Sequence, residues 1–343
     1  MAILRRIGAE GFRNLKGVDI ELDPVSNLIY GPNGAGKSNL LEAIYYLCYL
    51  RSYRNAIEEE LIGFDRDGFS LEGVGADKTA VVRLKDGKKK VILNSVERRR
   101  YSDYAGWIDC VVLTLSDIWI VRGSPTRRRE WLDILISRIR PDYYRELIEY
   151  RSILKQRNQL LLKGRMDGEI EAWTDRLVAV GKRIYRLRHA IFPEIENIYQ
   201  ELSDDLRLES TITYQPSTEP ESFRADLEAS QPRESEIGQT TVGPHRDEIV
   251  IKKSGHNMKG YGSEGEQRLS GIILRIVEQE LFKKKKKDPI LLLDEPFIEI
   301  DNNYRARVEE LLKRSHQLII ASTRDSNWGR RFKINGGRIE VAG

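Results

Sequence analysis

The amino-acid sequence predicts an α/β fold that is interrupted by a long antiparallel helical hairpin. Strand-like segments and one helix fill the first 120 residues, and strands and helices alternate again beyond residue 237. Between these parts, apolar residues recur at helical spacing in two long stretches that a short turn separates. At 343 residues, with 32% charged and 40% apolar, the chain is typical of a soluble globular protein with a large core.

The first part of the chain, residues 1–121, shows the alternating apolar pattern and the polar turns of short strands. Its clearest hairpin signal is Asp86-Gly87, a dipeptide that favours tight turns between strands. The apolar run CVVLTL has the length of one buried strand. We expect strands at 9–22, 27–30 and 110–115, a helix at 37–50 and a hairpin at 78–95.

The middle part, residues 122–236, is dominated by two helical stripes. One stripe starts at Tyr143 and steps by 4, 3 and 4 residues, and the other runs from Ile170 to Ile191 in steps of 3 and 4. The segment KGRMDGE between them predicts a turn, so the two helices should form an antiparallel hairpin. Residues 215–236 are rich in Pro, Ser and Glu, and we expect them to form a connecting segment.

Positive charge is concentrated in the middle part. Residues 122–191 hold 17 Lys and Arg against 9 Asp and Glu, a balance of +8, whereas the whole chain carries +4. This asymmetry permits a polyanion-binding surface. The cluster Arg127, Arg128 and Arg129 is either a DNA contact, which we favour, or a solvated helix start. For Lys283–Lys287 we favour the other interpretation, a solvated loop, with DNA binding as the alternative.

The last part, residues 237–343, alternates strands and helices. A strand is predicted at 248–253, followed by a glycine-rich loop at 261–268 that leads into an amphipathic helix. Further elements are expected as a buried strand at 290–293, a helix near 302–314 and a strand at 317–323.

The segment GPNGAGKS, Gly31 to Ser38, fits the phosphate-binding pattern G-x-x-x-x-G-K-[ST] at every defined position. It follows a predicted strand and opens a predicted helix, a context that favours a phosphate site over a chance glycine-rich turn. The glycines let backbone N–H groups surround a pyrophosphate, Lys37 reaches the β- and γ-phosphates, and Ser38 ligates Mg²⁺. The predicted ATP contacts are Gly31, Pro32, Asn33, Gly34, Ala35, Gly36, Lys37, Ser38 and Asn39.

The segment ILLLDEP places two carboxylates at the end of a buried strand. Asp294 emerges where the metal is expected, and Glu295 is placed to orient or deprotonate the attacking water. Together with the phosphate-binding loop, this pair predicts Mg²⁺-dependent ATP hydrolysis with Lys37, Asp294 and Glu295 as the catalytic residues.

The order of these motifs resembles that of the ABC-type ATPases: P-loop, helical insertion, SEGEQ (263–267), then LLLDEP followed by IEID. The resemblance implies that the signature SEGEQ of one subunit meets the nucleotide held by the P-loop of another. Ser263 and the N–H of Gly265 would contact the γ-phosphate, while Glu264 and Glu266 point sideways. It also implies nucleotide contacts from Gln267, Asp301 and Thr323.

Nearly the whole chain resembles the RecF family of bacterial recombination and repair proteins, relatives of the SMC-type ATPases. Transporter ATPases do not pair FRN near the start with GPHRD before the signature. The expected fold is therefore an ABC/SMC-type ATPase head, split between 1–121 and 237–343, with an inserted helical arm at 122–236. The resemblance is carried by GFRNL (11–15), IYGPNGAGKSNLLEAIYYL (29–47), RSYRN (51–55), GSPTRRREWLDILI (123–136), LKQRNQLL (154–161), TVGPHRDE (241–248) and GSEGEQR (262–268).

The resemblance implies an ATP-dependent homodimer that binds DNA, especially at gaps and single-strand/double-strand junctions. It implies weak, DNA-dependent ATP hydrolysis without covalent change to DNA, and cooperation with RecO and RecR in loading RecA. Some positions depart from the family: the signature is SEGEQ rather than an SQGQQ-like sequence, and Glu295 stands where a second aspartate is common. No Q-loop Gln and no switch His is present, so Asp117 and Thr323 are the expected substitutes.

Two motifs leave alternatives open. Arg13 and Asn14 either contact the edge of the nucleotide or hydrogen-bond the ends of strands. GPHRD, residues 243–247, either serves catalysis or, as we favour, forms a turn in which Arg246 and Asp247 brace the ATPase lobe.

Other function classes fit less well. A transporter ATPase is disfavoured, because the insertion in this chain is a long helical hairpin and no coupling partner is encoded. An ATP-dependent nuclease of the overcoming-lysogenization-defect type needs an acid-rich nuclease domain after the ATPase, and only about forty residues follow Asp301. Because the start has no apolar signal core and no apolar run reaches bilayer length, we expect a cytoplasmic protein without membrane contact. Cys48 and Cys110 lack metal-ligand spacing and are expected to be buried thiols.

Overall fold

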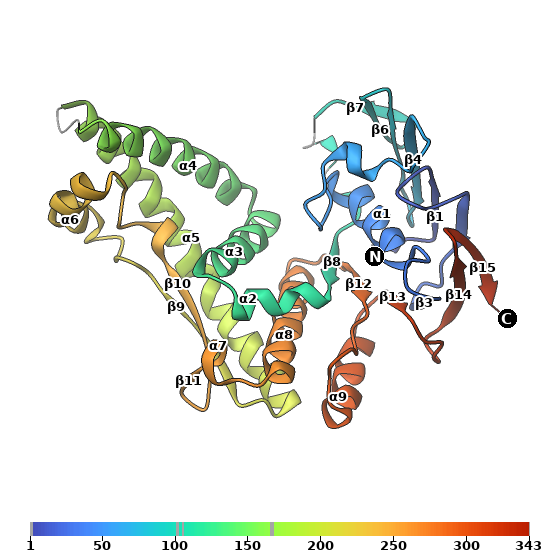
Figure 1. Ribbon diagram of the computed structural model, residues 1–343. Helices are drawn as coiled ribbons and strands as arrows, with labels where there is room; N and C mark the ends of the chain where they lie inside the picture. The colour runs from blue at the N-terminus through green and yellow to red at the C-terminus, as the bar shows by residue number, and fades with distance from the viewer. Residues whose placement is uncertain (1–2, 101–102, 105, 165–167, 343) are drawn as a thin grey trace. The chain divides into compact units, whose positions relative to one another are not determined.

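The computed structural model describes residues 3–100, 103–104, 106–164 and 168–342 (Figure 1), and the chain divides into two compact units. Unit 1 combines residues 1–115 with 278–343, and unit 2 is residues 116–277. The first division lies close to the predicted boundary after residue 121. The second differs from the predicted one after residue 236, because it falls inside the continuous helix α8 (Glu264–Lys284). The signature loop therefore belongs to unit 2.

Unit 1 contains a six-stranded sheet in the order β15-β14-β3-β13-β12-β8. All neighbours pair in parallel except β14 and β15, which form an antiparallel hairpin. The central strands are buried, which explains their nearly uninterrupted apolar sequences. The strands are β3 (Ser26–Tyr30), β8 (Cys110–Leu113), β12 (Ile290–Asp294), β13 (Leu318–Ser322), β14 (Arg330–Asn335) and β15 (Arg338–Ala342).

A second six-stranded sheet of unit 1 is entirely antiparallel, in the order β2-β1-β4-β5-β6-β7. Helix α1 (Lys37–Tyr49) packs against strands of both sheets, and eleven of its thirteen residues are buried. The other short elements of this unit are η1 (Glu58–Leu61) and α9 (Asn302–Lys313). The strands of the sheet are β1 (Arg6–Glu10), β2 (Val18–Glu21), β4 (Gly68–Val74), β5 (Thr79–Lys85), β6 (Lys88–Leu93) and β7 (Val96–Arg98).

The strand expected at residues 9–22 is wrong as one element, because a turn separates the end of β1 from β2. Gly11, Arg13 and Gly17 all have positive φ in this turn, which no strand accommodates. The predicted helix at 37–50, the hairpin at Asp86-Gly87 and the strand at 110–115 are confirmed. Of the strands of unit 1, β4, β7, β14 and β15 were not predicted.

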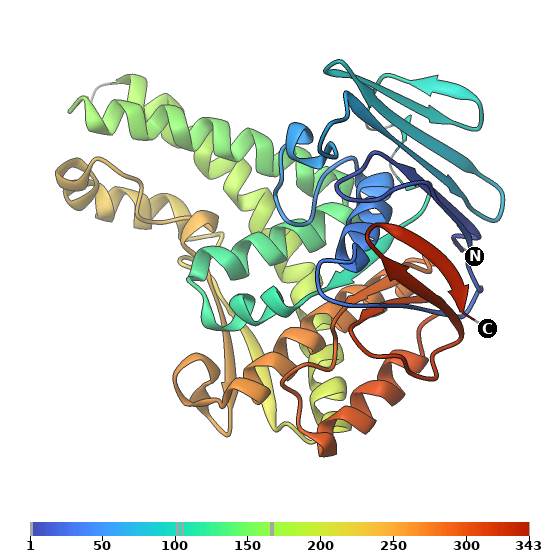
Figure 2. The same ribbon diagram turned by 45° about the vertical axis from the view of Figure 1, so that its right-hand side comes forward.

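Unit 2 is built around the predicted helical hairpin, whose two helices α4 (Pro141–Leu162) and α5 (Gly168–Leu206) pack side by side (Figure 2). Helix α5 runs fifteen residues beyond the predicted stripe and passes through Pro193. The remaining elements are η3 (Leu115–Asp117), which straddles the unit boundary, α2 (Ile118–Arg122), α3 (Pro125–Ile139), β9 (Ser210–Gln215), α6 (Phe223–Ile237), η4 (Pro244–Arg246), β10 (Glu248–Lys253), β11 (His256–Asn257) and α7 (Met258–Tyr261).

The connecting segment expected at 215–236 is wrong, because most of it forms helix α6. Phe223 and Leu227, one turn apart, are its buried apolar anchors. Glu234 is fully buried, with an oxygen 2.8 Å from the guanidinium of Arg157. A buried ion pair and two apolar side chains therefore hold a helix whose composition is that of a linker.

Two further observations complete the fold. Cys48 and Cys110 are buried thiols, as predicted. Among the helices that the structure describes, none is both long enough and apolar enough to span a bilayer.

Candidate nucleotide site

The loop Gly31–Gly36 joins the end of β3 to the start of α1, as the phosphate-binding pattern requires. Gly31 is tightly packed: a Cβ atom there would lie 2.2 Å from the carbonyl oxygen of Ile334 on β14. Gly36 caps α1 with φ of +116°, a value that side chains disfavour. Close packing thus imposes glycine at position 31, and a positive φ favours it at Gly36 and also at Gly34, whose φ is +77°. The loop presents the N-terminus of α1, which suits an anion such as the phosphates of ATP.

Lys37 is buried at this loop and its ammonium group is held by acceptors. Nζ donates to the carbonyl oxygens of Gly31 at 2.9 Å and Pro32 at 3.1 Å. It also lies 3.6 Å from Oε1 of Glu295. The structure therefore brings the predicted P-loop lysine and the predicted catalytic acid together, in a setting where a phosphate could replace loop carbonyls as partner of the cation.

Ser38 and Asp294 meet at the same point. Ser38 Oγ donates to Asp294 Oδ1 over 2.7 Å, and Asp294 ends strand β12. A hydroxyl and a carboxylate are hard oxygen ligands, and Mg²⁺ is usually held by one or two such groups together with phosphates and water. The residues present therefore fit Mg²⁺ bound with a nucleotide.

Glu295 follows Asp294 directly and has an unusual backbone. Its φ is 51°, and its N–H donates to the carbonyl oxygen of Ala321 on β13 over 2.9 Å. A non-glycine residue in the left-handed region costs free energy and is typical of functional sites. This conformation lets the side chain turn back toward Lys37.

Arg13 and Asn14 bind the protein itself. Asn14 Nδ2 donates to the carbonyl oxygen of Gly34 over 3.0 Å, and Asn14 Oδ1 accepts from Asn39 over 2.9 Å. Arg13 pairs with the buried carboxylate of Glu42 at 3.1 Å. Of the two alternatives from the sequence, these contacts support structural hydrogen bonding, since Asn14 and Asn39 shape the P-loop from outside.

Two residues that the sequence analysis missed reach the same place. Tyr53 donates to the carbonyl oxygen of Ser38 at 3.2 Å and lies 3.4 Å from Asp294 Oδ2. Burial and then the nearby charge of Asp294 raise the pKa of Tyr53, so the phenol remains a donor. Arg54 Nη2 lies 3.7 Å from Asp294 Oδ2. The segment RSYRN had been noted as part of the family resemblance, but no residue pattern within it indicates its place beside the metal site.

The hairpin β14–β15 backs the loop. Gly337 N–H donates to the carbonyl oxygen of Ala35 over 2.9 Å, and its own carbonyl accepts from Lys16 N–H at the same distance. Thr323, exposed just beyond β13, adjoins Ser322, whose carbonyl oxygen accepts from Gly31 N–H at 3.3 Å. Thr323 therefore lies beside the P-loop. Asp301 is exposed and caps α9 by accepting from Asn303 N–H at 2.8 Å.

In unit 2, the signature loop forms the N-cap of α8. Glu266 accepts from Ser263 N–H at 2.9 Å, while Ser263 Oγ lies 3.4 Å from Glu266 N, a reciprocal arrangement typical of a capping box. Glu266 also pairs with Lys253, and Glu264 pairs with Arg122 at 2.9 Å. Burial opposes ionisation, yet the hydrogen bonds from Lys253 and Ser263 lower the pKa of Glu266. Both acids thus point to cations beside the loop, as expected.

Gln267 and Asp117 have internal roles. The amide nitrogen of Gln267 donates to the carbonyl oxygens of Met258 at 3.0 Å and Gly262 at 2.8 Å, so the side chain, which is buried, positions the signature loop. This corrects its assignment as a direct nucleotide contact. Asp117 is buried and accepts from Arg275 over 2.6 Å.

The three arginines predicted to bind DNA differ in exposure. Arg127 is exposed, whereas Arg129 is half-buried and donates to the carbonyl oxygen of Asp247 at 2.9 Å. Arg128 is buried, and its guanidinium donates to Glu248 at 2.9 Å and to the carbonyl oxygen of Gly123 at 3.1 Å. The prediction is wrong for Arg128, because its hydrogen-bonding groups hold α3 to β10.

The GPHRD turn braces unit 2 rather than the ATPase lobe, which corrects part of the favoured interpretation. Asp247 is buried and accepts from Tyr185, Tyr214 and Ser217 N–H. It also pairs with the buried Arg188, whose guanidinium reaches Asp133 at 2.8 Å. The guanidinium of Arg246 donates to Thr240 O and to Gln239, which lie just before the turn in unit 2.

Comparison with known proteins identifies relatives over nearly the whole chain. The RecF/RecN/SMC N terminal domain family matches residues 3–333. A protein of Halalkalibacterium halodurans named DNA replication and repair protein RecF is 33% identical, with 93% of this chain and 92% of that protein covered. A protein of the same name from Streptococcus pneumoniae is 33% identical with the same coverage.

Solved structures agree with these matches. The recombination mediator protein RecF of the RecFOR pathway, with ATP, has a TM-score of 0.87 and 31% identity, covering 100% of this chain and 98% of that one. The Smc head domain of Pyrococcus furiosus has a TM-score of 0.61 and 17% identity, covering 100% of this chain and 96% of that chain, which shows a shared fold.

Proposed function

Because this chain belongs to the RecF family of SMC-type ATPases, we propose that it is an ATP-dependent DNA-binding protein of DNA replication and recombinational repair. The observation that carries the proposal is the convergence of Lys37 with Glu295 and of Ser38 with Asp294 at the P-loop. Relatives that are named for DNA replication and repair support the biological role.

The residues of unit 1 divide the work of ATP hydrolysis. Gly31–Gly36 and the N-terminus of α1 bind the phosphates, and Lys37 neutralises their charge. Ser38 and Asp294 would hold Mg²⁺, which would supply positive charge against the phosphates of ATP. Glu295 accepts a proton from the attacking water or orients it. Tyr53 and Arg54 keep the Asp294 carboxylate in place.

A second copy of the chain completes the site. The capped N-terminus of α8 presents Ser263, which is exposed, and the N–H groups beside it, a suitable partner for the γ-phosphate of another subunit. In a two-fold dimer each nucleotide would then lie between the P-loop of one chain and the signature of the other. Asp301 and Thr323 would adjoin the same nucleotide.

The dimer is proposed to bind gapped or junction DNA and to hydrolyse ATP slowly, without covalent change to the DNA. Hydrolysis would reset the DNA-bound state. By family resemblance, RecR and RecO are the proposed partners and RecA loading the outcome. Arg127 and the outward basic residues of the helical hairpin remain proposed DNA contacts.

The experiment compares Glu295→Gln and Lys37→Met with wild type by gel filtration with ATP and gapped DNA. Glu295→Gln should retain ATP and accumulate as a dimer on DNA, since an amide cannot act as a base. Lys37→Met should bind no ATP and remain monomeric, because the cation is lost from a site made otherwise of backbone N–H groups.

Lys333→Met, an exposed lysine on β14, is the control and should behave as wild type. Normal turnover by Glu295→Gln would place the catalytic base elsewhere. ATP affinity of Lys37→Met within a few-fold of the control would remove the P-loop assignment.

A further inference from the structure

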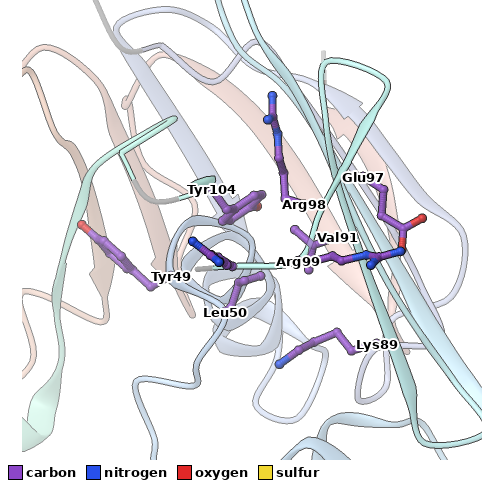
Figure 3. Close-up of a pocket in the computed structure, with 9 residues that line it drawn as sticks. Tyr49, Leu50, Lys89, Val91, Glu97, Arg98, Arg99 and Tyr104 are labelled. Atoms are coloured by element: carbon purple, nitrogen blue, oxygen red, sulfur yellow. The ribbon is translucent and has the colours of Figure 1, made fainter. Parts of the chain in front are cut away.

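A cavity of about 460 Å³ lies in unit 1 between the end of α1 and the β6–β7 hairpin (Figure 3). Tyr49 and Leu50 form its wall at the end of α1, and Lys89 approaches from β6. The sequence analysis singled out no residue of this cavity. Its lining is Tyr49, Leu50, Lys89, Val91, Glu97, Arg98, Arg99, Arg100 and Tyr104.

The positive charge of this cavity exceeds the negative charge near it. Glu97, the acid of the lining, already pairs with Lys90 at 3.3 Å. Lys89 pairs with Glu58, which also accepts from Tyr46 over 2.8 Å. The other cations of the lining are three consecutive arginines, 98–100, of which the last two are exposed. Arg98 Nε is buried and has no hydrogen-bond partner within the part of the chain that the structure describes.

A buried guanidinium donor without an acceptor is costly unless a ligand supplies one. The hydroxyls of the cavity tyrosines bond elsewhere: Tyr49 donates to the carbonyl oxygen of Cys110 and accepts from its N–H, and Tyr104 donates to the carbonyl oxygen of Leu47. Guanidinium groups match the oxygens of a phosphate through parallel hydrogen bonds. The cavity therefore fits a phosphate group.

The charge around the cavity favours a polyanion over a single phosphate ion. Residues 83–100 hold eight Lys and Arg against two Asp and Glu, a balance of +6. The register even places cations opposite each other, Arg83 against Lys90 and Lys85 against Lys88. Like charges at directly opposed positions are destabilising. Such a field attracts a chain of phosphates from a distance.

We propose that the cavity, with Arg98, Arg99 and Arg100, binds backbone phosphates of DNA. The inference rests on the proposed function and adds a contact surface in unit 1, separate from the basic faces of the helical hairpin. Three long cationic side chains on adjacent residues can together neutralise more than one backbone phosphate.

The test uses the full-length protein with ATP and gapped duplex DNA at several salt concentrations. The double variant Arg99→Ser/Arg100→Ser removes two exposed cations and should fold normally. Its slope of log affinity against log salt should be shallower by about two, as expected for two lost phosphate contacts. ATP affinity should remain that of wild type. Arg98→Lys keeps the charge but loses the buried Nε–H, and should weaken DNA binding without flattening the slope as much.

The matched control is Lys333→Ser/Arg338→Ser, which removes two exposed cations elsewhere in unit 1. Equal slopes for the arginine variant and this control would overturn the proposal while leaving the proposed function intact. A wild-type protein that binds no DNA under any condition would overturn both. Binding of inorganic pyrophosphate that only the arginine variant loses, with an unchanged DNA slope, would identify a small-anion site and also overturn it.

Discussion

The hydroxyl of Ser38 donates to a carboxylate oxygen of Asp294 across 2.7 Å, although 256 positions separate the two residues. Strand β13 pairs in parallel with both β3 and β12, so the ends of β3 and β12 reach the same edge of the sheet. The P-loop follows β3 and Asp294 ends β12. Parallel pairing therefore assembles the metal site, as it does at the carboxyl ends of strands in open α/β sheets.

Replacing Asp294 with Asn should uncouple nucleotide binding from the metal. An amide is a poorer Mg²⁺ ligand than a carboxylate, while Lys37 and the loop N–H groups remain. We expect ATP binding to persist but to lose its enhancement by Mg²⁺, and hydrolysis to fall by roughly 100-fold or more. Isothermal titration with and without Mg²⁺ measures this, with exposed Asp77→Asn as control. Undiminished Mg²⁺ enhancement would exclude Asp294 as a ligand.

Mixing Ser263→Arg with Lys37→Met should restore activity that neither variant has alone. Ser263→Arg places a bulky cation at the signature but leaves its own P-loop intact, so it should bind ATP without dimerising. In the mixed dimer one composite site carries both lesions and the other carries neither. Partial return of ATP-dependent dimerisation or turnover is expected. Absence of recovery at every mixing ratio, with both proteins folded, would count against assembly between subunits.

Arg127 and Arg128 are adjacent but should respond differently to charge reversal. Arg128→Glu replaces the buried cation that pairs with Glu248 by a second acid. The repulsion between the two carboxylates and the loss of the ion pair should destabilise unit 2 by about 3–5 kcal/mol. Arg127→Glu lies on the surface and should change stability by about 0.5 kcal/mol or less. Urea unfolding compares the two.

Salt-dependent DNA binding then tests the proposed role of Arg127. Removing one phosphate contact should reduce the salt slope by about one. An unchanged slope in the folded Arg127→Glu protein would show that this arginine is merely solvated.

The GPHRD turn should make unit 2 sensitive to mildly acidic pH. His245 Nδ1 lies 2.8 Å from the Tyr150 hydroxyl and Nε2 lies 3.1 Å from the carbonyl oxygen of Thr240, so the neutral ring donates to Thr240 and accepts from Tyr150. Burial, aided by nearby arginines, lowers the pKa of His245 from 6.5 to about 4. Between pH 6.5 and about pH 4, His245 is protonated in the unfolded chain and neutral in the folded chain.

The contribution of His245 is therefore complete above pH 6.5 and is lost as the pH falls toward 4. At pH 5.5 the free energy of unfolding should be lower by roughly 1 kcal/mol than at pH 7.5. His245→Gln should remove most of this difference while costing stability at both pH values. Urea midpoints that shift equally in wild type and variant would assign the pH dependence to other groups.

The motifs with regular spacing were predictable from the sequence, and the partners of charged side chains were not. The P-loop and the two long helices follow from local patterns that a turn or a helix requires. The burial of Arg128 depends on Glu248, 120 positions away, so no local pattern indicates it. Helix α6 was missed for a similar reason. Its buried Glu234 is tolerated in the interior because it pairs with Arg157, a distant residue that no local pattern indicates.

Unit 2 is inserted between the two halves of unit 1, and this order of the chain determines which unit can fold first during synthesis. Asn27 on β3 hydrogen-bonds Leu318 on β13, 291 positions later. At the usual elongation rates, about 15–60 s separate the synthesis of these partners. Unit 2 is one continuous segment and can fold first. Until β13 is synthesised, β3 lacks this sheet neighbour, and β3 and α1 keep apolar surface exposed. The P-loop, made early, becomes able to hold a nucleotide only after the strands that flank it have emerged, so a nascent or truncated chain should expose aggregation-prone segments for chaperones to cover.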